Sequence, residues 1–299
     1  MIDTARAAVS LGIACAALAA LPGRAAGDID RGRYLVDSVM ACGNCHTAKD
    51  SEARPIRSRH LAGGGVTWDV PPFSGAAPNI TPDRETGIGR WSDEEIRRAL
   101  VEGERPAHGR LAGVPLGAPM PVNLYRALTR ADQDAIVAYL RSVPAVRNEV
   151  AVPTRRTPVK RAPYPDAQRA YGAVDLRDPV RRGAYLAALA HCMECHTPSS
   201  PQGSLYGTAM GLGGKAFAPP AITGFPEWWK GAVSRNITPH PELGIGRWSD
   251  AEVKRAIREG VSRDGRTLSP PMPFENYAEM TEADLDALVA WLRSLPPRP

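Results

Sequence analysis

Residues 42–46 read Cys-Gly-Asn-Cys-His, and residues 192–196 read Cys-Met-Glu-Cys-His. Cys-x-x-Cys-His is the attachment pattern of c-type haem. Two thiols on one helical turn can form thioether bonds to the two vinyl groups of one porphyrin, and the next histidine can bind the iron. We therefore predict two covalently bound haem c groups. The predicted thioether bonds come from Cys42, Cys45, Cys192 and Cys195, and the predicted axial nitrogen ligands are His46 and His196.

Two other kinds of site use paired cysteines, namely a thioredoxin-like redox pair and a zinc site. A redox pair would be expected within a βαβ pattern, which the sequence does not show. A zinc site built from both motifs, 150 residues apart, would leave the two histidines unexplained. Haem attachment therefore accounts for the motifs better than either alternative.

Residues 1–26 have the pattern of a secretory signal peptide. Arg6 precedes an apolar run at residues 7–21, and the small residues Ala25 and Ala26 mark a cleavage position. The run is shorter than the ~20 apolar residues that span a bilayer. We therefore expect a periplasmic protein, free or held peripherally on the outer face of the inner membrane, with no transmembrane segment in the mature chain.

The formal net charge of +5 could indicate a nucleic-acid partner, but two corrections remove it. Loss of residues 1–26 takes the charge to +4. Two haems would then add four ionised propionates and bring the sum to about zero. We therefore expect no nucleic-acid partner.

The two motifs belong to a long internal duplication. The offset between the copies drifts from 150 to 157 residues, so the insertions lie in loops. The repeated stretches include Asn-Ile-Thr-Pro (79–82 and 236–239), Gly-Ile-Gly-Arg-Trp-Ser-Asp (87–93 and 244–250) and Pro-Met-Pro (119–121 and 271–273). We predict a signal peptide at 1–26, a first domain at 27–147, a linker at 148–175 and a second domain at 176–299.

The linker is rich in proline and in basic residues, which predicts an extended strap on the surface. Its basic residues could instead contact an acidic partner. They are Arg155, Arg156, Lys160 and Arg161.

The composition favours short helices joined by long loops. Glycine (28 residues) and proline (29 residues) make up nearly a fifth of the chain, and aromatic residues only 6%. A large β-sandwich or a doubly wound sheet would need more β-branched and aromatic runs. Helix starts are indicated at equivalent places in both halves by Ser92 with Glu95, Ser249 with Glu252, Thr129 and Thr281. We therefore predict an all-α fold of two tandem domains.

Each half offers one methionine as the sixth iron ligand. Met120 follows His46 by 74 residues and Met272 follows His196 by 76, each between two prolines. A thioether is a soft ligand that favours reduced iron. A lone methionine could also be core packing, but these two methionines are the pair that the repeat retains. We predict that Met120 and Met272 bind the irons.

Haem propionates need hydrogen-bond donors or solvent, because burial of a bare carboxylate is costly. A guanidinium and an indole recur in identical context in the two halves. The candidates are Arg90, Trp91, Arg247 and Trp248. The alternative for these residues is simple packing where the next helix begins.

Each half resembles a class I cytochrome c. The series from Asn-Ile-Thr-Pro through Pro-Met-Pro to Tyr-Leu-Arg-Ser resembles the multihaem cytochrome subunits of membrane-associated alcohol, aldehyde and gluconate dehydrogenases. Similar dihaem proteins accompany periplasmic molybdenum hydroxylases. The resemblance implies a helical fold in which a glycine of the first helix packs against an aromatic residue of the closing helix. Gly32 with Tyr139 and Gly183 with Trp291 fit those places.

The motifs and the resemblance favour electron transfer. We expect a dihaem protein that passes single electrons from a dehydrogenase to the respiratory chain, as a carrier or as an electron-transfer subunit. We expect it to have no catalytic chemistry of its own. The acceptor would be a quinone, another cytochrome or a terminal oxidase. The alternative is a dihaem enzyme, such as a cytochrome c peroxidase or an oxidase of a small sulfur compound. Such an enzyme needs an open iron, and the Pro-Met-Pro stretch in both halves argues against one.

Overall fold

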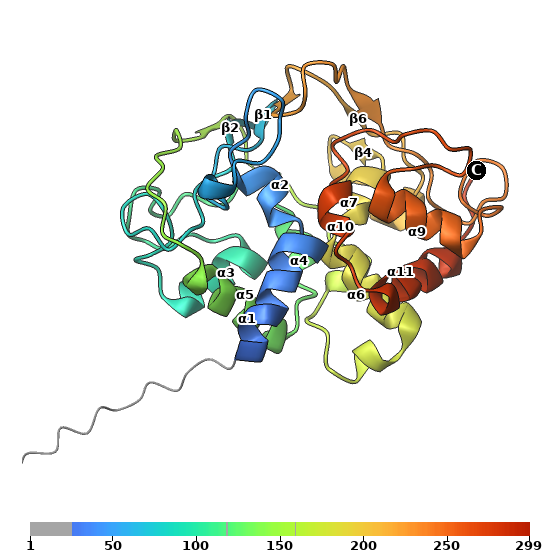
Figure 1. Cartoon of the computed structure of the whole chain (residues 1–299), viewed down its shortest axis with the longest axis horizontal. Helices are drawn as coiled ribbons and strands as arrows, with labels where there is room; N and C mark the ends of the chain where they lie inside the picture. The colour runs from blue at the N-terminus through green and yellow to red at the C-terminus, as the bar shows by residue number, and fades with distance from the viewer. Residues whose placement is uncertain (1–25, 118, 159) are drawn as a thin grey trace, which may run out of the picture.

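The structure is a computed structural model and describes residues 26–117, 119–158 and 160–299. The expected signal peptide falls almost entirely on residues 1–25, which lie outside the described residues. Two helical units lie beside each other, the first formed by the N-terminal half and the second by the C-terminal half (Figure 1). None of the helices in the described part is long and apolar enough to cross a membrane.

The helices of the two units follow the same order. In the first unit they are α1 (Ala26–Arg33), its π-helical continuation η1 (Tyr34–Val39), α2 (Cys42–His46), the 3₁₀ turn η2 (Arg57–Arg59), α3 (Asp93–Glu102), α4 (Val122–Tyr125) and α5 (Arg130–Ser142). In the second unit they are α6 (Pro179–Leu189), α7 (Cys192–His196), α8 (Tyr206–Ala209), α9 (Asp250–Glu259), α10 (Phe274–Tyr277) and α11 (Glu282–Ser294). Two 3₁₀ turns, η3 (Pro165–Ala167) and η4 (Asp175–Arg177), lie between the units.

The predicted helix starts are confirmed. Ser92 and Ser249 accept hydrogen bonds from the backbone of Glu95 and Glu252, whose carboxylates bond back to the serine N–H groups. These are complete capping boxes, which satisfy N–H groups that a helix start leaves unpaired. The N-cap threonines of α5 and α11 likewise accept from the backbone N–H groups three residues ahead.

The predicted glycine contacts are also confirmed. A Cβ atom on Gly32 would lie 2.0 Å from the carbonyl oxygen of Ala135 and 2.7 Å from the Cβ of Tyr139. A Cβ atom on Gly183 would lie 2.0 Å from the carbonyl oxygen of Ala287 and 2.6 Å from the Cβ of Trp291. The first and closing helices of each unit therefore touch backbone to backbone, which only glycine permits.

The prediction of an all-α fold is wrong. Helices make up 37% of the described residues, and several loops pair as strands. The strands are β1 (Thr67–Val70), β2 (Phe73–Ala76), β3 (Thr154–Arg155), β4 (Ser199–Ser200), β5 (Gly203–Ser204), β6 (Ala216–Phe217), β7 (Ile222–Thr223) and β8 (Ala232–Val233). The strands are only two to four residues long, which is too short for a run of β-forming residues to be recognised in the sequence.

The largest sheet joins three parts of the chain. Its order is β3-β2-β1-β7, and all its pairs are antiparallel. β1 and β2 form a hairpin in the first unit, β3 comes from the linker, and β7 comes from the second unit. The linker is also packed inside, since Tyr164 is buried and its ring stacks edge-on against Tyr206, with centroids 5.1 Å apart. It is therefore more than a strap on the surface.

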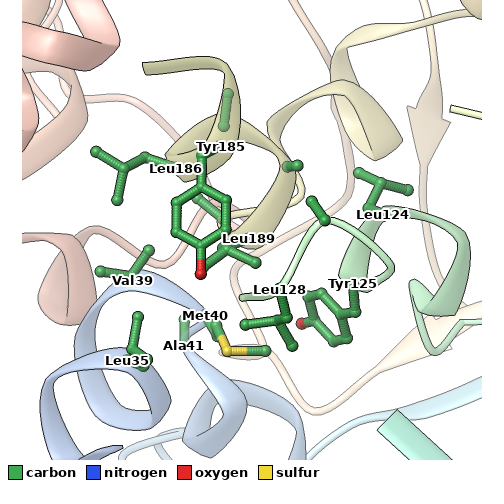
Figure 2. Packing of buried hydrophobic residues seen from close by; sticks show 14 of the residues in the cluster. Leu35, Val39, Met40, Ala41, Leu124, Tyr125, Leu128, Tyr185, Leu186 and Leu189 are labelled. Atoms are coloured by element: carbon green, nitrogen blue, oxygen red, sulfur yellow. The ribbon is translucent and has the colours of Figure 1, made fainter. Parts of the chain in front are cut away.

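One hydrophobic core runs through both units. Figure 2 shows side chains from η1, α4 and α6 pointing into the same cluster, with Met40 lying near Tyr185 and Leu128. Met40 follows η1 in the first unit, and Tyr185 lies on α6 in the second. Because residues of both units share one core, burial of apolar surface holds the units together.

Two buried carboxylates form reciprocal contacts between the units. Asp132, at the start of α5, accepts from Arg31 of its own unit (2.8 and 2.9 Å) and from the hydroxyl of Tyr185 in the other unit. Asp284, at the start of α11, accepts from Arg182 of its own unit (2.8 Å) and from the hydroxyl of Tyr34 in the other unit. We refer to these six residues as the carboxylate cluster between the units. The repeated Arg-Gly-x-Tyr sequence therefore links the two units.

Removal of one tyrosine hydroxyl should loosen this contact. Tyr34→Phe or Tyr185→Phe leaves a buried aspartate without one of its donors, which costs about 1–3 kcal/mol. We expect each variant to lower the free energy of unfolding of the haem-loaded protein by that amount. Chemical denaturation followed by circular dichroism measures it.

Arg54→Gln is the control, because its ion pairs with Asp50 and Glu52 lie on an exposed turn and exposed pairs contribute little. Wild-type stability in both tyrosine variants would contradict the role given to the carboxylate cluster between the units.

Candidate haem sites

Each motif helix begins after a residue in the left-handed backbone region. Ala41 precedes α2 with φ 48°, and His191 precedes α7 with φ 44°. A residue other than glycine in this region costs roughly 1–2 kcal/mol. The same cost appears at the same place in both units, where the chain turns from the first helix into the motif helix. The left-handed residue therefore sets the direction in which the motif helix leaves the first helix.

The two motif histidines are held in the same way. His46 Nδ1 lies 2.7 Å from the carbonyl oxygen of Pro78, and His196 Nδ1 lies 2.7 Å from that of Arg235. A carbonyl can only accept, so Nδ1 donates in each ring and Nε2 keeps its lone pair. Burial lowers the pKa of both imidazoles and favours the neutral form. A neutral ring with an oriented, free Nε2 is the arrangement that a metal ligand requires.

The environment of the motif cysteines disfavours the thiolate. Burial raises the pKa of Cys42, Cys192 and Cys195 to about 12 and that of Cys45 to about 11. All four residues are half-buried. Two half-buried cysteines on a short helix, followed by an oriented histidine, fit covalent attachment of haem.

The two Pro-Met-Pro stretches adopt the same turn. The backbone N–H two residues after each methionine donates to the methionine carbonyl, at 2.9 Å for Met120 and 3.1 Å for Met272. Both side chains are half-buried and pack against the core. Each turn leads directly into a short helix, α4 or α10. The units therefore present the two methionines in equivalent settings.

The candidate propionate donors differ in position. Trp91 and Trp248 pack against the core. Arg90 is exposed, and Arg247 is exposed and pairs with Glu242 at 3.3 Å. The structure thus brings the indoles of these repeats toward the interior, whereas the two guanidiniums lie at the surface.

Two arginines of the closing helices were not singled out from the sequence. Arg141 donates to the carbonyls of Trp91 and Ile88, and Arg293 donates to the carbonyls of Trp248 and Ile245. They hold the Gly-Ile-Gly-Arg-Trp segment against the closing helix. The signal was present, because Leu-Arg-Ser recurs at the end of both closing helices.

The two motif helices lie on facing sides of the units (Figure 1). Asn44 of α2 donates to the carbonyl of Pro271, next to Met272, at 3.5 Å. Lys49 reaches the carbonyl of Gly224 in the second unit at 2.9 Å. The two candidate sites are therefore neighbours across the interface.

Two repeated helical units, each with an oriented Cys-x-x-Cys-His helix and a matching methionine turn, define a c-type cytochrome with two domains. The cytochrome c family matches this chain twice, at residues 29–144 and 180–296. The chain belongs to the cytochrome c family.

Several characterised proteins are similar to it. A nicotinate dehydrogenase component of Pseudomonas putida is 30% identical over 289 residues, which cover 91% of this chain and 22% of that protein. The fructose dehydrogenase cytochrome subunit of Gluconobacter japonicus is 44% identical over 40% of this chain and 22% of its own length. A diheme cytochrome c-type protein of Cereibacter sphaeroides is 37% identical over 39% of this chain and 36% of its own length. The matches thus span about a fifth to a third of these relatives.

Removal of one cysteine pair should remove one haem. We expect the double variant Cys192→Ser, Cys195→Ser to carry half the covalent haem of the wild-type chain, because Ser cannot form the thioether bonds. The pyridine haemochrome spectrum of the denatured protein measures the ratio of haem to chain. An unchanged ratio would contradict attachment at α7, and the pair Cys42→Ser, Cys45→Ser tests α2 in the same way.

Proposed function

We propose that this chain is a periplasmic electron-transfer protein that carries single electrons through two covalently bound haems. The observation that carries the proposal is the pair of neighbouring motif helices, each with a histidine whose Nε2 is left free. A bound haem supplies the one-electron chemistry of its iron. The residues of the chain set the ligands, the polarity and the contacts around it.

The ligand set that we propose is the same in both units. His46 and His196 supply nitrogen from the motif helices, and Met120 and Met272 supply sulfur from the Pro-Met-Pro turns. Carbonyl acceptors at Nδ1 hold each imidazole plane and make it a better donor. A histidine and a thioether together would leave no ligand position of a bound haem iron open, which would favour electron transfer over substrate binding.

The propionates need partners, and we retain the two tryptophans as candidates. Trp91 and Trp248 offer indole N–H groups from equivalent, half-buried positions. Arg90 and Arg247 lie at the surface, from where they would reach only a solvent-facing propionate.

The relatives support a dehydrogenase as the electron donor. Their names describe cytochrome subunits of fructose, alcohol and gluconate dehydrogenases. We propose that a periplasmic or membrane-associated dehydrogenase reduces this protein, and that a quinone, another cytochrome or a terminal oxidase of the respiratory chain accepts the electrons.

A redox titration with optical detection of the haem-loaded protein tests the proposal. We expect two low-spin centres at positive potentials that do not react with peroxide or carbon monoxide. A high-spin centre with peroxide turnover would contradict the proposal and support the alternative of a dihaem enzyme.

The methionines are tested separately. Met120→Ala or Met272→Ala should lower one of the two potentials and let carbon monoxide bind that reduced iron, because each removes a soft ligand. Met210→Leu is the control, since Met210 also packs half-buried against the core but lies outside a Pro-Met-Pro turn. An unchanged spectrum in either alanine variant would exclude that methionine as a ligand.

A further inference from the structure

The methionine turn of the second unit can supply few backbone hydrogen bonds of its own. Residues 269–273 read Ser-Pro-Pro-Met-Pro, and the three prolines have no backbone N–H. A carbonyl in this stretch must therefore accept from a side chain, from another segment of the chain or from water. The donor that it receives helps to set the position of Met272.

The indole of Trp229 supplies a donor to this turn. Its N–H donates to the carbonyl of Pro270 at 2.9 Å and to the hydroxyl of Ser269 at 3.1 Å. The Ser269 hydroxyl in turn donates to the Pro270 carbonyl at 3.1 Å. Trp229 is only 3% exposed, and a buried indole N–H needs an acceptor within the protein. A buried donor therefore fixes the backbone two residues before Met272.

The loop that carries Trp229 is longer than its counterpart in the first copy. The offset between the copies rises from 150 at the Gly-Gly repeat (63–64 and 213–214) to 157 at Asn-Ile-Thr-Pro, so the additional residues lie between these two repeats. This part of the second copy includes β6, β7 and β8. Its β7 pairs with β1, so the loop reaches across to the first unit (Figure 1).

The first unit in turn holds this loop. Trp229 is buried in a small core with Val66 of the first unit, and Cys45 of the first motif packs against the same core. A Cβ atom on Gly224, which has φ 96°, would lie 2.2 Å from the carbonyl oxygen of Gly65. The loop and the first unit therefore touch backbone to backbone, which glycine permits. Both units thus set the position of Trp229.

We propose that Trp229 is a positioning residue for the second iron: from a loop seated on the first unit, its indole holds the turn from which Met272 would bind the haem of its own unit. The alternative is that Trp229 only fills the small core, but packing alone does not require its N–H to reach the backbone beside Met272. A thioether ligand raises the potential of a haem iron, so loss of the indole contact would lower that potential. This inference rests on the proposed ligand set.

Redox titration of the haem-loaded Trp229→Phe variant tests it, because Phe keeps a buried aromatic ring but has no donor for Pro270. We expect the potential that Met272→Ala lowers to fall by a smaller amount, and carbon monoxide to bind that reduced iron more readily than in wild type. The potential that Met120→Ala lowers should keep its wild-type value. Trp228→Phe is the matched control, since the side chain of Trp228 is 68% exposed and makes no hydrogen bond to the described residues.

Two further variants keep the test decisive if Trp229→Phe does not fold. Ser269→Ala, at an exposed position, removes one acceptor of the indole and one donor to Pro270, so it should lower the same potential. Gly224→Ala should lower it as well, because the added Cβ displaces the loop from the first unit. Unchanged potentials in Gly224→Ala would overturn the role given to the first unit.

The results separate this inference from the proposed function. If Met272→Ala lowers one potential while Trp229→Phe lowers only the free energy of unfolding, the role of Trp229 is structural and the inference is overturned. A fall in the potential that Met120→Ala lowers would overturn it too. If Met272→Ala changes neither the spectrum nor a potential, the proposed ligand set itself fails.

Discussion

The relative position of the two units depends on two buried aspartates. Asp132 and Asp284 begin the closing helices, where the N-terminal end of a helix favours negative charge. Each binds an arginine of its own unit and a tyrosine of the other. A buried carboxylate is tolerated only when its hydrogen bonds are complete. Neither carboxylate is therefore satisfied unless both units are folded and docked in this one arrangement.

That docking is what makes the two motif helices neighbours. The first helix of each unit carries an arginine and a tyrosine of the contact: α1 with its continuation η1 in the first unit, and α6 in the second. Each leads into its motif helix, α2 or α7, through a left-handed residue. The helix that docks the unit thus also aims its motif. Core residues on the same first helices add apolar burial to the polar contact (Figure 2). A change in the interface would therefore alter the positions of both motif helices.

Short sequence patterns predicted the structural features that depend on local contacts. They did not predict the features that depend on contacts between segments far apart in the chain. The capping boxes follow from short motifs, the packing of Gly32 and Gly183 was implied by the resemblance to class I cytochrome c, and both were confirmed. The strands β3 and β7 were missed because they form only by pairing with a hairpin far away in the chain, and the other strands were missed because they are only two to four residues long.

The duplication separates two kinds of residue. Positions that the copies share, such as Arg31 with Arg182 and Asn79 with Asn236, make the same contacts twice, which is expected of groups that build the domain. Positions where the copies differ include Arg105 and Ser262, each two residues after the glycine that ends α3 or α9, and here an arginine that donates to the carbonyls of residues 114 and 115 is replaced by a neutral residue. Two sites with identical surroundings would have equal potentials and give electrons no preferred direction. In this chain the copies differ in charge in the loops that precede the methionine turns and within the motif helices, where Glu194 takes the place of Asn44.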